Sequence, residues 1–269
     1  MRKCQTGVGP GDRLAKHKAS ARSTVRRAKA AKATLRPFRF ASGSPSGPVE
    51  TSPRLKSAER AAVEFWIRRM PEAFANRLRS SRQGPVKVGV ADQLISLGGS
   101  VFINEMPPGK PGASAEEKDF QRFSEPFAVS YIPERYIVLE RALFRRRIEL
   151  GRILYHELCH FLWPRLGNQR RRRFRELIRR ELRERVRGEL GYSSEIRRAA
   201  LSAASRKGIS RRSLARQQRD YFCECFCDTG AYVLLGSERR TNHSEFTLSR
   251  AARERRARAW EAVALSNTR

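Results

Sequence analysis

One segment of the chain, residues 148–162, reads IELGRILYHELCHFL. Its large apolar residues recur at steps of three and four positions, which is the period of one face of an α-helix. Pro164 follows shortly after the segment, and proline is typical of positions just beyond a helix end. We therefore predict a buried helix here, around which the rest of the fold is expected to pack.

The same segment contains His156, Glu157 and His160, which match the pattern His-Glu-x-x-His. On a helix the two histidines lie on one face about 6 Å apart, so both imidazoles can reach one metal ion. Glu157 is placed to act on a metal-bound water without being a ligand itself. The alternative is a pair of ordinary helix histidines, but the chain has only four histidines and two of them are here.

A tetrahedral zinc site with an open catalytic position needs a third protein ligand. The continuation of the motif that would supply a third histidine is absent, because Leu166 occupies its place. His243 is the one histidine further along the chain. The competing candidate is Glu224, in the segment YFCECFCD at residues 221–228.

Glu224 and Asp228 lie four residues apart, on one face of a helix predicted for residues 220–235. Their neighbours are apolar, and two carboxylates entering such a helix are costly unless a cation or a hydrogen bond receives them. We expect Glu224 to bind the metal directly and Asp228 to accept the free N–H of a ligand histidine. Ala231 extends this face and is expected to let the two helices approach closely.

A His-Glu-x-x-His helix followed by a second helix with Glu-x-x-x-Asp resembles the gluzincin branch of the zinc metallopeptidases, the thermolysin-like arrangement. The resemblance covers residues 155–160 and 221–235. It implies a hydrolase with one zinc ion and a zincin-like α+β fold. It also implies a role for each motif residue, namely zinc ligands His156, His160 and Glu224, general base Glu157, and Asp228 as the residue that orients a histidine.

Two further features of that family have candidates in the chain. Its transition-state donor could be Tyr221, Tyr232 or His243, and each of these could equally be a packing or surface residue. In zincin-like proteins, an edge strand that precedes the metal helix holds the substrate in extended form through backbone hydrogen bonds. We assign residues 136–139 to this role, with an ordinary core strand as the alternative.

Four of the five cysteines lie near these motifs, namely Cys159, Cys223, Cys225 and Cys227. A thiolate-rich zinc or iron–sulfur site is one interpretation. However, Cys-x-Cys-x-Cys on a helix directs its sulfurs to different sides, which favours small buried residues. A redox-sensitive switch near the zinc is a third interpretation. The odd number of cysteines argues against a secreted disulfide framework.

Periodicity and turn residues predict the remaining elements. Strands are expected at residues 86–90, 101–104, 127–132 and 136–139, with a hairpin turn at Pro133-Glu134 and a loop at residues 106–124. Further helices are expected from Ser57 to Met70, from Arg170 to Leu190, and from Ser249 to Ala264 with Trp260 on its packing face. We predict a single zincin-like α+β domain at residues 56–269, in which a small mixed sheet packs on the two ligand-bearing helices.

The chain is strongly basic, with a formal net charge of +30. Residues 1–55 are rich in Lys, Arg, Ala, Ser, Gly and Pro, and we expect them to form a disordered basic tail. A charge of this size favours polyanions, so non-specific binding of nucleic acid through the basic surface is expected. No apolar stretch is long enough to span a membrane and no signal peptide is recognised, which favours a cytoplasmic location.

The sequence therefore predicts a zinc-dependent peptidase that acts on peptide or protein substrates. The alternative is a basic nucleic-acid-binding protein whose zinc site is structural or vestigial. The two differ in whether peptide bonds are hydrolysed.

Overall fold

The computed structural model describes residues 47–79, 84–97, 100–104, 127–206, 208–238 and 243–266. Residues 1–46 of the expected tail and the expected loop at residues 106–124 lie outside this part of the chain. The chain divides into two units, one formed by Phe40–Ala91 and Phe127–Arg269, the other by Met1–Arg39 and Asp92–Pro126. In the second unit, β3 (Gln93–Leu97) and β4 (Ser100–Asn104) form an antiparallel hairpin, of which the sequence predicted β4.

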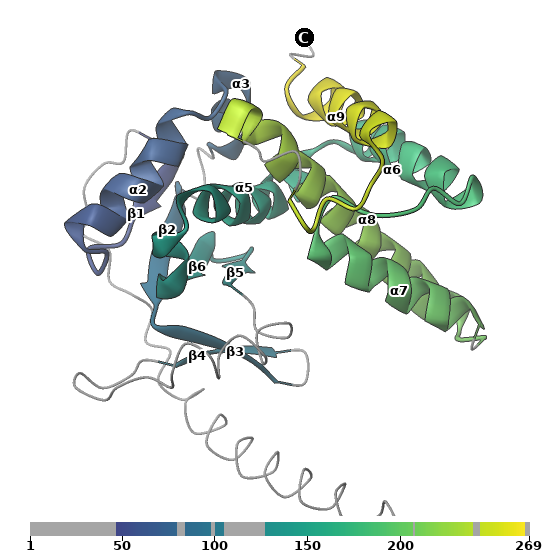
Figure 1. The fold of residues 1–269 in the computed structure, drawn as a ribbon, viewed down its shortest axis with the longest axis horizontal. Coiled ribbons are helices and arrows are strands. Elements are labelled where there is room, and N and C mark those ends of the chain that lie inside the picture. Colours follow the sequence, from purple (N-terminus) through teal and green to yellow (C-terminus); the bar gives the residue numbers. More distant parts are fainter. Residues whose placement is uncertain are drawn as a thin grey trace, which may run out of the picture. The chain divides into compact units, whose positions relative to one another are not determined.

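A four-stranded mixed sheet lies in the larger unit, in the order β1–β2–β6–β5 (Figure 1). Its strands are β1 (Val49–Thr51), β2 (Val86–Ala91), β5 (Ala128–Tyr131) and β6 (Tyr136–Glu140). β1 and β6 run parallel to β2, whereas β5 runs antiparallel to β6. Because β1 falls inside the expected tail, the folded part of the chain begins before residue 56.

The hairpin predicted around Pro133-Glu134 is confirmed, but its second strand is not an edge strand. β6 pairs with β2 on one side and with β5 on the other, so the assignment of residues 136–139 to the edge is wrong. The buried run Ile137, Val138 and Leu139 fits an interior strand. Among the described strands of this sheet, β5 lies at the end beside β6.

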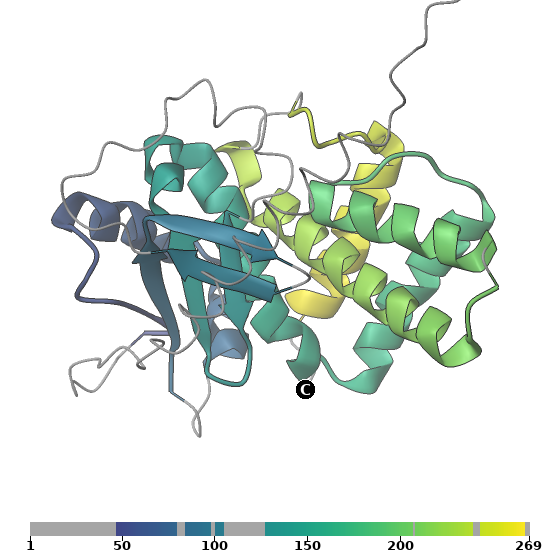
Figure 2. The ribbon, with the colours of Figure 1, turned by 90° about the horizontal axis from the view of Figure 1, so that it is seen from below.

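The helix predicted at residues 148–162 is confirmed as α5 (Arg147–Leu162). It packs against the sheet and against α8 (Arg211–Leu234), as Figures 1 and 2 show. The other helices are α2 (Ser57–Arg68), α3 (Glu72–Leu78), α6 (Asn168–Arg183), α7 (Tyr192–Arg206) and α9 (Arg250–Ala264). This mixture of helices with a small mixed sheet is compatible with the predicted α+β class.

The basic helix α6 ends at Arg183, not at Leu190 as its apolar spacing predicted. Arg185 adopts a left-handed backbone conformation with φ 55°, and the N–H of Val186 donates to the carbonyl of Glu181 at 2.9 Å. This hydrogen bond satisfies a carbonyl that the last turn of the helix would otherwise leave unpaired. No helix in the described ranges is both long and apolar enough to cross a membrane.

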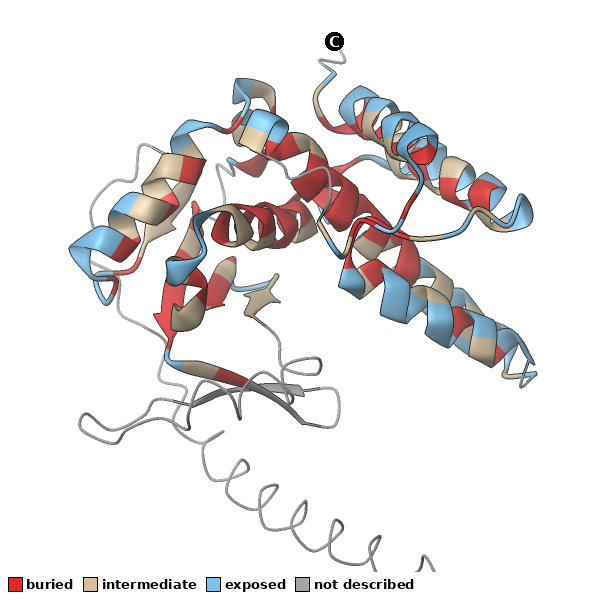
Figure 3. Ribbon diagram, viewed as in Figure 1, coloured by how far each residue is buried: buried red, intermediate tan, exposed pale blue. Residues whose placement is uncertain are grey.

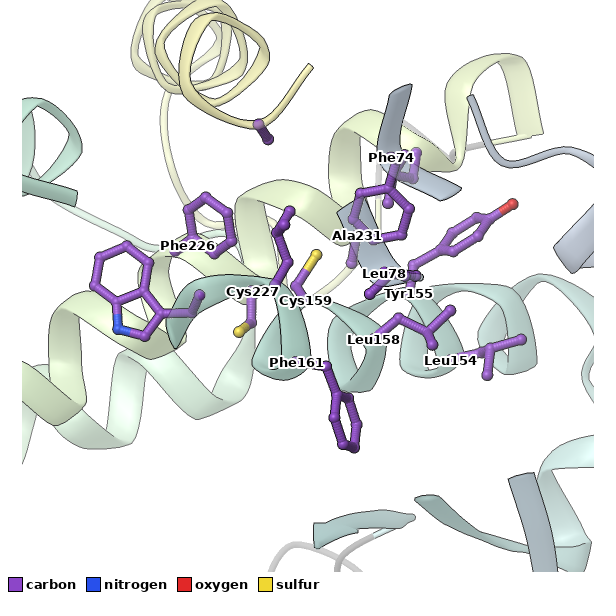
Figure 4. Packing of buried hydrophobic residues seen from close by; sticks show 14 of the residues in the cluster. Phe74, Leu78, Leu154, Tyr155, Leu158, Cys159, Phe161, Phe226, Cys227 and Ala231 are labelled. Carbon is purple, nitrogen blue, oxygen red and sulfur yellow. The ribbon is translucent and has the colours of Figure 1, made fainter. Parts of the chain in front are cut away.

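The hydrophobic core runs from the sheet through α5 and α8 to α9 (Figure 3). Trp260, predicted on the packing face of α9, is fully buried, with its ring centroid 5.6 Å from that of Phe226 and 6.0 Å from that of Phe74. Figure 4 shows Phe226 and Phe74 together with Cys159 of α5. Burial of one such side chain contributes about 1.5–3 kcal/mol, so this contact fixes α9 against α8.

A buried ion cluster links α6, α8 and α9. Arg256 of α9 donates to Glu181 at 2.7 Å and to Glu189 at 2.6 Å, and all three side chains are buried. Glu189 also accepts from Arg198 at 3.1 Å and from the Tyr221 hydroxyl at 2.6 Å. The positive charge of Arg256 is therefore paired with carboxylates inside the fold and does not add to the basic surface.

Gly230 of α8 lies where a side chain would meet both α5 and α9. A Cβ atom added there would lie 2.4 Å from Cys159 Sγ and 2.8 Å from Trp260 Cζ2. We expect Gly230→Ala to lower the free energy of unfolding by about 1–3 kcal/mol, because the core must shift to admit the methyl group. Urea denaturation would measure this.

Gly167→Ala is the matched control, since nothing lies within 4 Å of a Cβ added at Gly167. It is expected to lower the free energy of unfolding by about 0.5–1 kcal/mol, because Gly167 is the N-cap of α6 and alanine is a poorer N-cap. Equal midpoints and slopes for the two variants would contradict the close approach of the helices.

Candidate metal centre

Two histidines of α5 face a glutamate of α8. The Nε2 atoms of His156 and His160 lie 3.2 Å apart. Glu224 Oε2 lies 3.3 Å from His156 Nε2 and 3.8 Å from His160 Nε2. These groups are close enough to hold one metal ion, although Glu224 is 64 residues beyond His160 in the chain.

Asp228 lies one turn after Glu224 and holds His156. Its Oδ1 lies 2.8 Å from His156 Nδ1, and its Oδ2 accepts the backbone N–H of Ser194 at 3.1 Å. Because Asp228 accepts the Nδ1 proton, the Nε2 atom of His156 is the ring nitrogen directed at Glu224. Gly191 permits this arrangement, since a Cβ added there would lie 2.4 Å from the Asp228 carboxyl group.

Glu157 lies beside the two histidines and contacts the sheet. Ligand-type atoms of Glu157, His156 and His160 all lie within 4.8 Å of one another. Ser130, on the end strand β5, donates its hydroxyl proton to Glu157 Oε2 at 2.5 Å. The carboxylate of Glu157 is thus fixed at the edge of the cluster by a strand that the sequence did not connect with the site.

The cluster is buried on one side and partly open on the other. The side chains of His156 and Asp228 are 7% and 2% exposed, whereas those of His160 and Glu224 are 19% and 16% exposed. The inner groups are therefore fixed by the protein, and the outer groups retain contact with solvent.

Carboxylates control the protonation of the two histidines. Burial by itself lowers the pKa of His156, but Asp228 and Glu224 outweigh it and raise that pKa well above its ordinary value. Burial also lowers the pKa of His160, but Glu224 and Cys223 raise it to about 9. Burial likewise raises the pKa of Glu224 and of Asp228, yet the histidines hold both below their ordinary values. The cluster therefore favours positive charge at its centre.

The cysteines divide into two groups. Cys159, Cys225 and Cys227 are buried, as small packing residues would be. Cys223 is half-buried, and its Sγ lies 3.6 Å from His160 Nδ1. Ligand-type atoms of Cys223, Cys227 and His160 lie within 4.8 Å of one another, so one face of α8 carries two of the sulfurs.

The three candidates for a transition-state donor make other contacts. The Tyr221 hydroxyl donates to Glu189 in the buried ion cluster at 2.6 Å. Tyr232 is buried against Phe246, with ring centroids 5.3 Å apart. His243 lies with its Nε2 3.0 Å from Glu149 Oε2, and its Nδ1 accepts the N–H of Glu245 at 3.2 Å. The contacts of Tyr221 and His243 direct both side chains at carboxylates outside the metal cluster.

Sequence reasoning missed Ser130 and Gly191 at the site, and it weighed Cys223 as a thiolate or packing residue but not as a partner of His160. For Cys223 a signal existed, because it adjoins Glu224 and precedes Cys227 by one helical turn. Ser130 and Gly191 carried no comparable signal, since each makes its contact only after distant elements meet.

No known protein family, curated protein or solved structure matches the chain. The candidate metal centre is therefore described from the geometry of its own residues.

Proposed function

We propose that the protein is a zinc metallopeptidase of the gluzincin type, which holds one zinc ion through His156, His160 and Glu224. The separation of the three ligand atoms supports this proposal. Tetrahedral zinc binds histidine nitrogen and carboxylate oxygen at about 2.0–2.2 Å, which places neighbouring ligand atoms about 3.3–3.6 Å apart. The three separations here are 3.2, 3.3 and 3.8 Å.

The chemistry of the donors favours zinc over the hard cations. Two imidazole nitrogens and one carboxylate suit zinc, whereas Ca²⁺ and Mg²⁺ prefer sites built from oxygen. Three protein ligands also leave the fourth position of a tetrahedron open, which is the pattern of catalytic zinc rather than structural zinc.

Glu157 supplies the general base in this proposal. A bound zinc ion would lower the pKa of a water molecule towards 7 and polarise the carbonyl group of the scissile bond. The Glu157 carboxylate would accept the proton of that water and then transfer it to the leaving amine. Ser130 holds Glu157 by its hydrogen bond, and Asp228 keeps His156 in the tautomer that a ligand requires.

The substrate would bind as an extended peptide along β5 rather than β6. β5 is the end strand of its sheet in the described part of the chain, and it carries Ser130 beside Glu157. An extended peptide can add to such a strand through backbone hydrogen bonds. An antiparallel end strand beside the metal helix also supports the zincin-like assignment of the fold.

Metal analysis combined with a peptide-library digest tests the proposal. We expect about one zinc ion per chain and hydrolysis that a chelator abolishes and added zinc restores. Protein that binds no zinc, or that binds zinc and cleaves no peptide, would contradict it. Salt-dependent retention on nucleic acid without any cleavage would instead support the basic nucleic-acid-binding alternative.

Zinc binding is expected to strengthen as the pH rises from about 6 to about 9. The pKa of His160 is raised to about 9 and that of His156 is also raised, so below these values the metal must displace protons. Each displaced proton makes the apparent affinity rise by about tenfold per pH unit. Competition with a chelator of known proton affinity would measure this, and a pH-independent affinity would contradict the assignment of these histidines as ligands.

A further inference from the structure

The two candidate ligand histidines are held at Nδ1 by different groups. His156 Nδ1 lies 2.8 Å from a carboxylate oxygen of Asp228. His160 Nδ1 lies 3.6 Å from the sulfur of Cys223, a distance typical of a hydrogen bond to sulfur. Both Nε2 atoms are thereby directed at Glu224.

We propose that Cys223 is a positioning residue of the metal centre, whose sulfur accepts the Nδ1–H of His160 and keeps His160 Nε2 directed at the metal. This inference rests on the proposed zinc site. It gives Cys223 the task for His160 that Asp228 performs for His156.

The tautomer of His160 determines the direction of this hydrogen bond. A neutral imidazole that binds a metal through Nε2 carries its proton on Nδ1. His160 is only partly exposed, and a protein group that accepts this proton fixes the ring and increases its basicity. The Cys223 sulfur lies at the required position, so His160 is the donor in the metal-bound state.

The geometry argues against Cys223 as a ligand of the same ion. The two nitrogens of an imidazole direct their bonds to diverging sides of the ring. Cys223 Sγ lies next to Nδ1, whereas His156 and Glu224 lie next to Nε2. The sulfur is therefore on the side of the ring away from the ligand triangle.

One helix, α8, carries the groups that hold the two histidines. Cys223, Glu224 and Asp228 all belong to this one helix. α8 therefore contributes the third ligand and a hydrogen-bond partner for each histidine of α5. A small shift of α8 would disturb all three contacts together.

Removal of the acceptor should weaken zinc binding without abolishing it. We expect Cys223→Ala to raise the zinc dissociation constant by about tenfold, since partners of ligand histidines are worth about 10–100-fold in metal affinity. Cys223→Ser keeps an acceptor and should recover most of this loss. Cys225→Ala is the matched control, because Cys225 lies on the same helix but its thiol is directed at Glu189.

NMR of the zinc-loaded full chain supplies a readout that a general loss of packing would not change. We expect a slowly exchanging imidazole N–H resonance from His156 and another from His160, of which Cys223→Ala loses only the second. Unchanged zinc affinity together with both resonances in Cys223→Ala would overturn the inference.

Cobalt substitution distinguishes an acceptor sulfur from a ligand sulfur. We expect no thiolate-to-cobalt charge-transfer band in the wild-type protein. A band that Cys223→Ala removes would overturn the inference by making Cys223 a ligand. Wild-type protein that binds no metal would instead refute the proposed function itself, so the two failures are distinguishable.

Discussion

Glu157→Gln is expected to retain zinc and to lower kcat for peptide hydrolysis by about 10²–10⁴-fold, the range that general acid–base groups contribute. The glutamine amide has almost the shape of the carboxylate and can still accept the hydrogen bond from Ser130. It cannot accept a proton from water, so the loss should appear in kcat. Zinc content and steady-state kinetics on one peptide would measure both quantities.

Two further variants test whether the loss is specific to the Glu157 carboxylate. Glu64→Gln removes one negative charge from an exposed ion pair on α2, and it should leave zinc content and kcat unchanged. Ser130→Ala leaves the Glu157 carboxylate in place but removes its partner, so a smaller loss of kcat is expected. If Glu157→Gln kept full activity with zinc bound, Glu157 would not be the base.

The fold was predictable wherever local periodicity determines an element. The spacing of apolar residues predicted α5, and the amphipathic pattern predicted α9, whose first turn is capped by Ser249 Oγ accepting the N–H of Ala252. The end of α6 was not predictable, because apolar spacing continues beyond Arg183. The left-handed conformation of Arg185 stops the helix, although arginine is not a residue that usually adopts it.

The order of strands in the sheet could not be read from the hairpin alone. β5 and β6 are both short and apolar, and they differ in position only because β2 pairs with β6. β2 lies about 45 residues earlier in the chain, a separation at which the sequence pattern carries no pairing information. The edge position was therefore assigned to the wrong strand of the hairpin.

The metal cluster was more predictable than the groups around it. Helical spacing brings His156 and His160 together, and the cost of burying Glu224 and Asp228 without a partner suggested that they face a cation. The contacts of Ser130 and Cys223 depend on how β5 and α8 approach α5. The Ser130 hydroxyl carries no such energetic signal in the sequence, and the position of Cys223 beside Glu224 does not specify which histidine its sulfur meets.

Glu224→Ala is expected to raise the zinc dissociation constant by more than about 100-fold, because loss of a direct ligand should exceed the 10–100-fold that its hydrogen-bonded neighbours contribute. The variant keeps His156 and His160 but loses the carboxylate that closes the triangle from α8. Zinc content after dialysis, together with chelator competition, would measure the loss. Glu176→Ala is the charge-matched control, since Glu176 is exposed on α6.

The loss should be larger at about pH 9 than at about pH 7, and this difference is specific to the proposed site. Glu224 is the chief group that raises the pKa of His160 to about 9, so its removal also makes that histidine easier to deprotonate. At about pH 7 protons compete with zinc for His160, and this competition lowers the apparent zinc affinity of the wild-type protein by up to about 100-fold. The variant suffers less of this competition, because its His160 has a lower pKa. Near pH 9 proton competition is weak in both proteins, so the ratio of their zinc dissociation constants reports the missing ligand alone. Wild-type affinity in Glu224→Ala at both pH values would assign the third ligand elsewhere, and His243 could serve only by leaving Glu149.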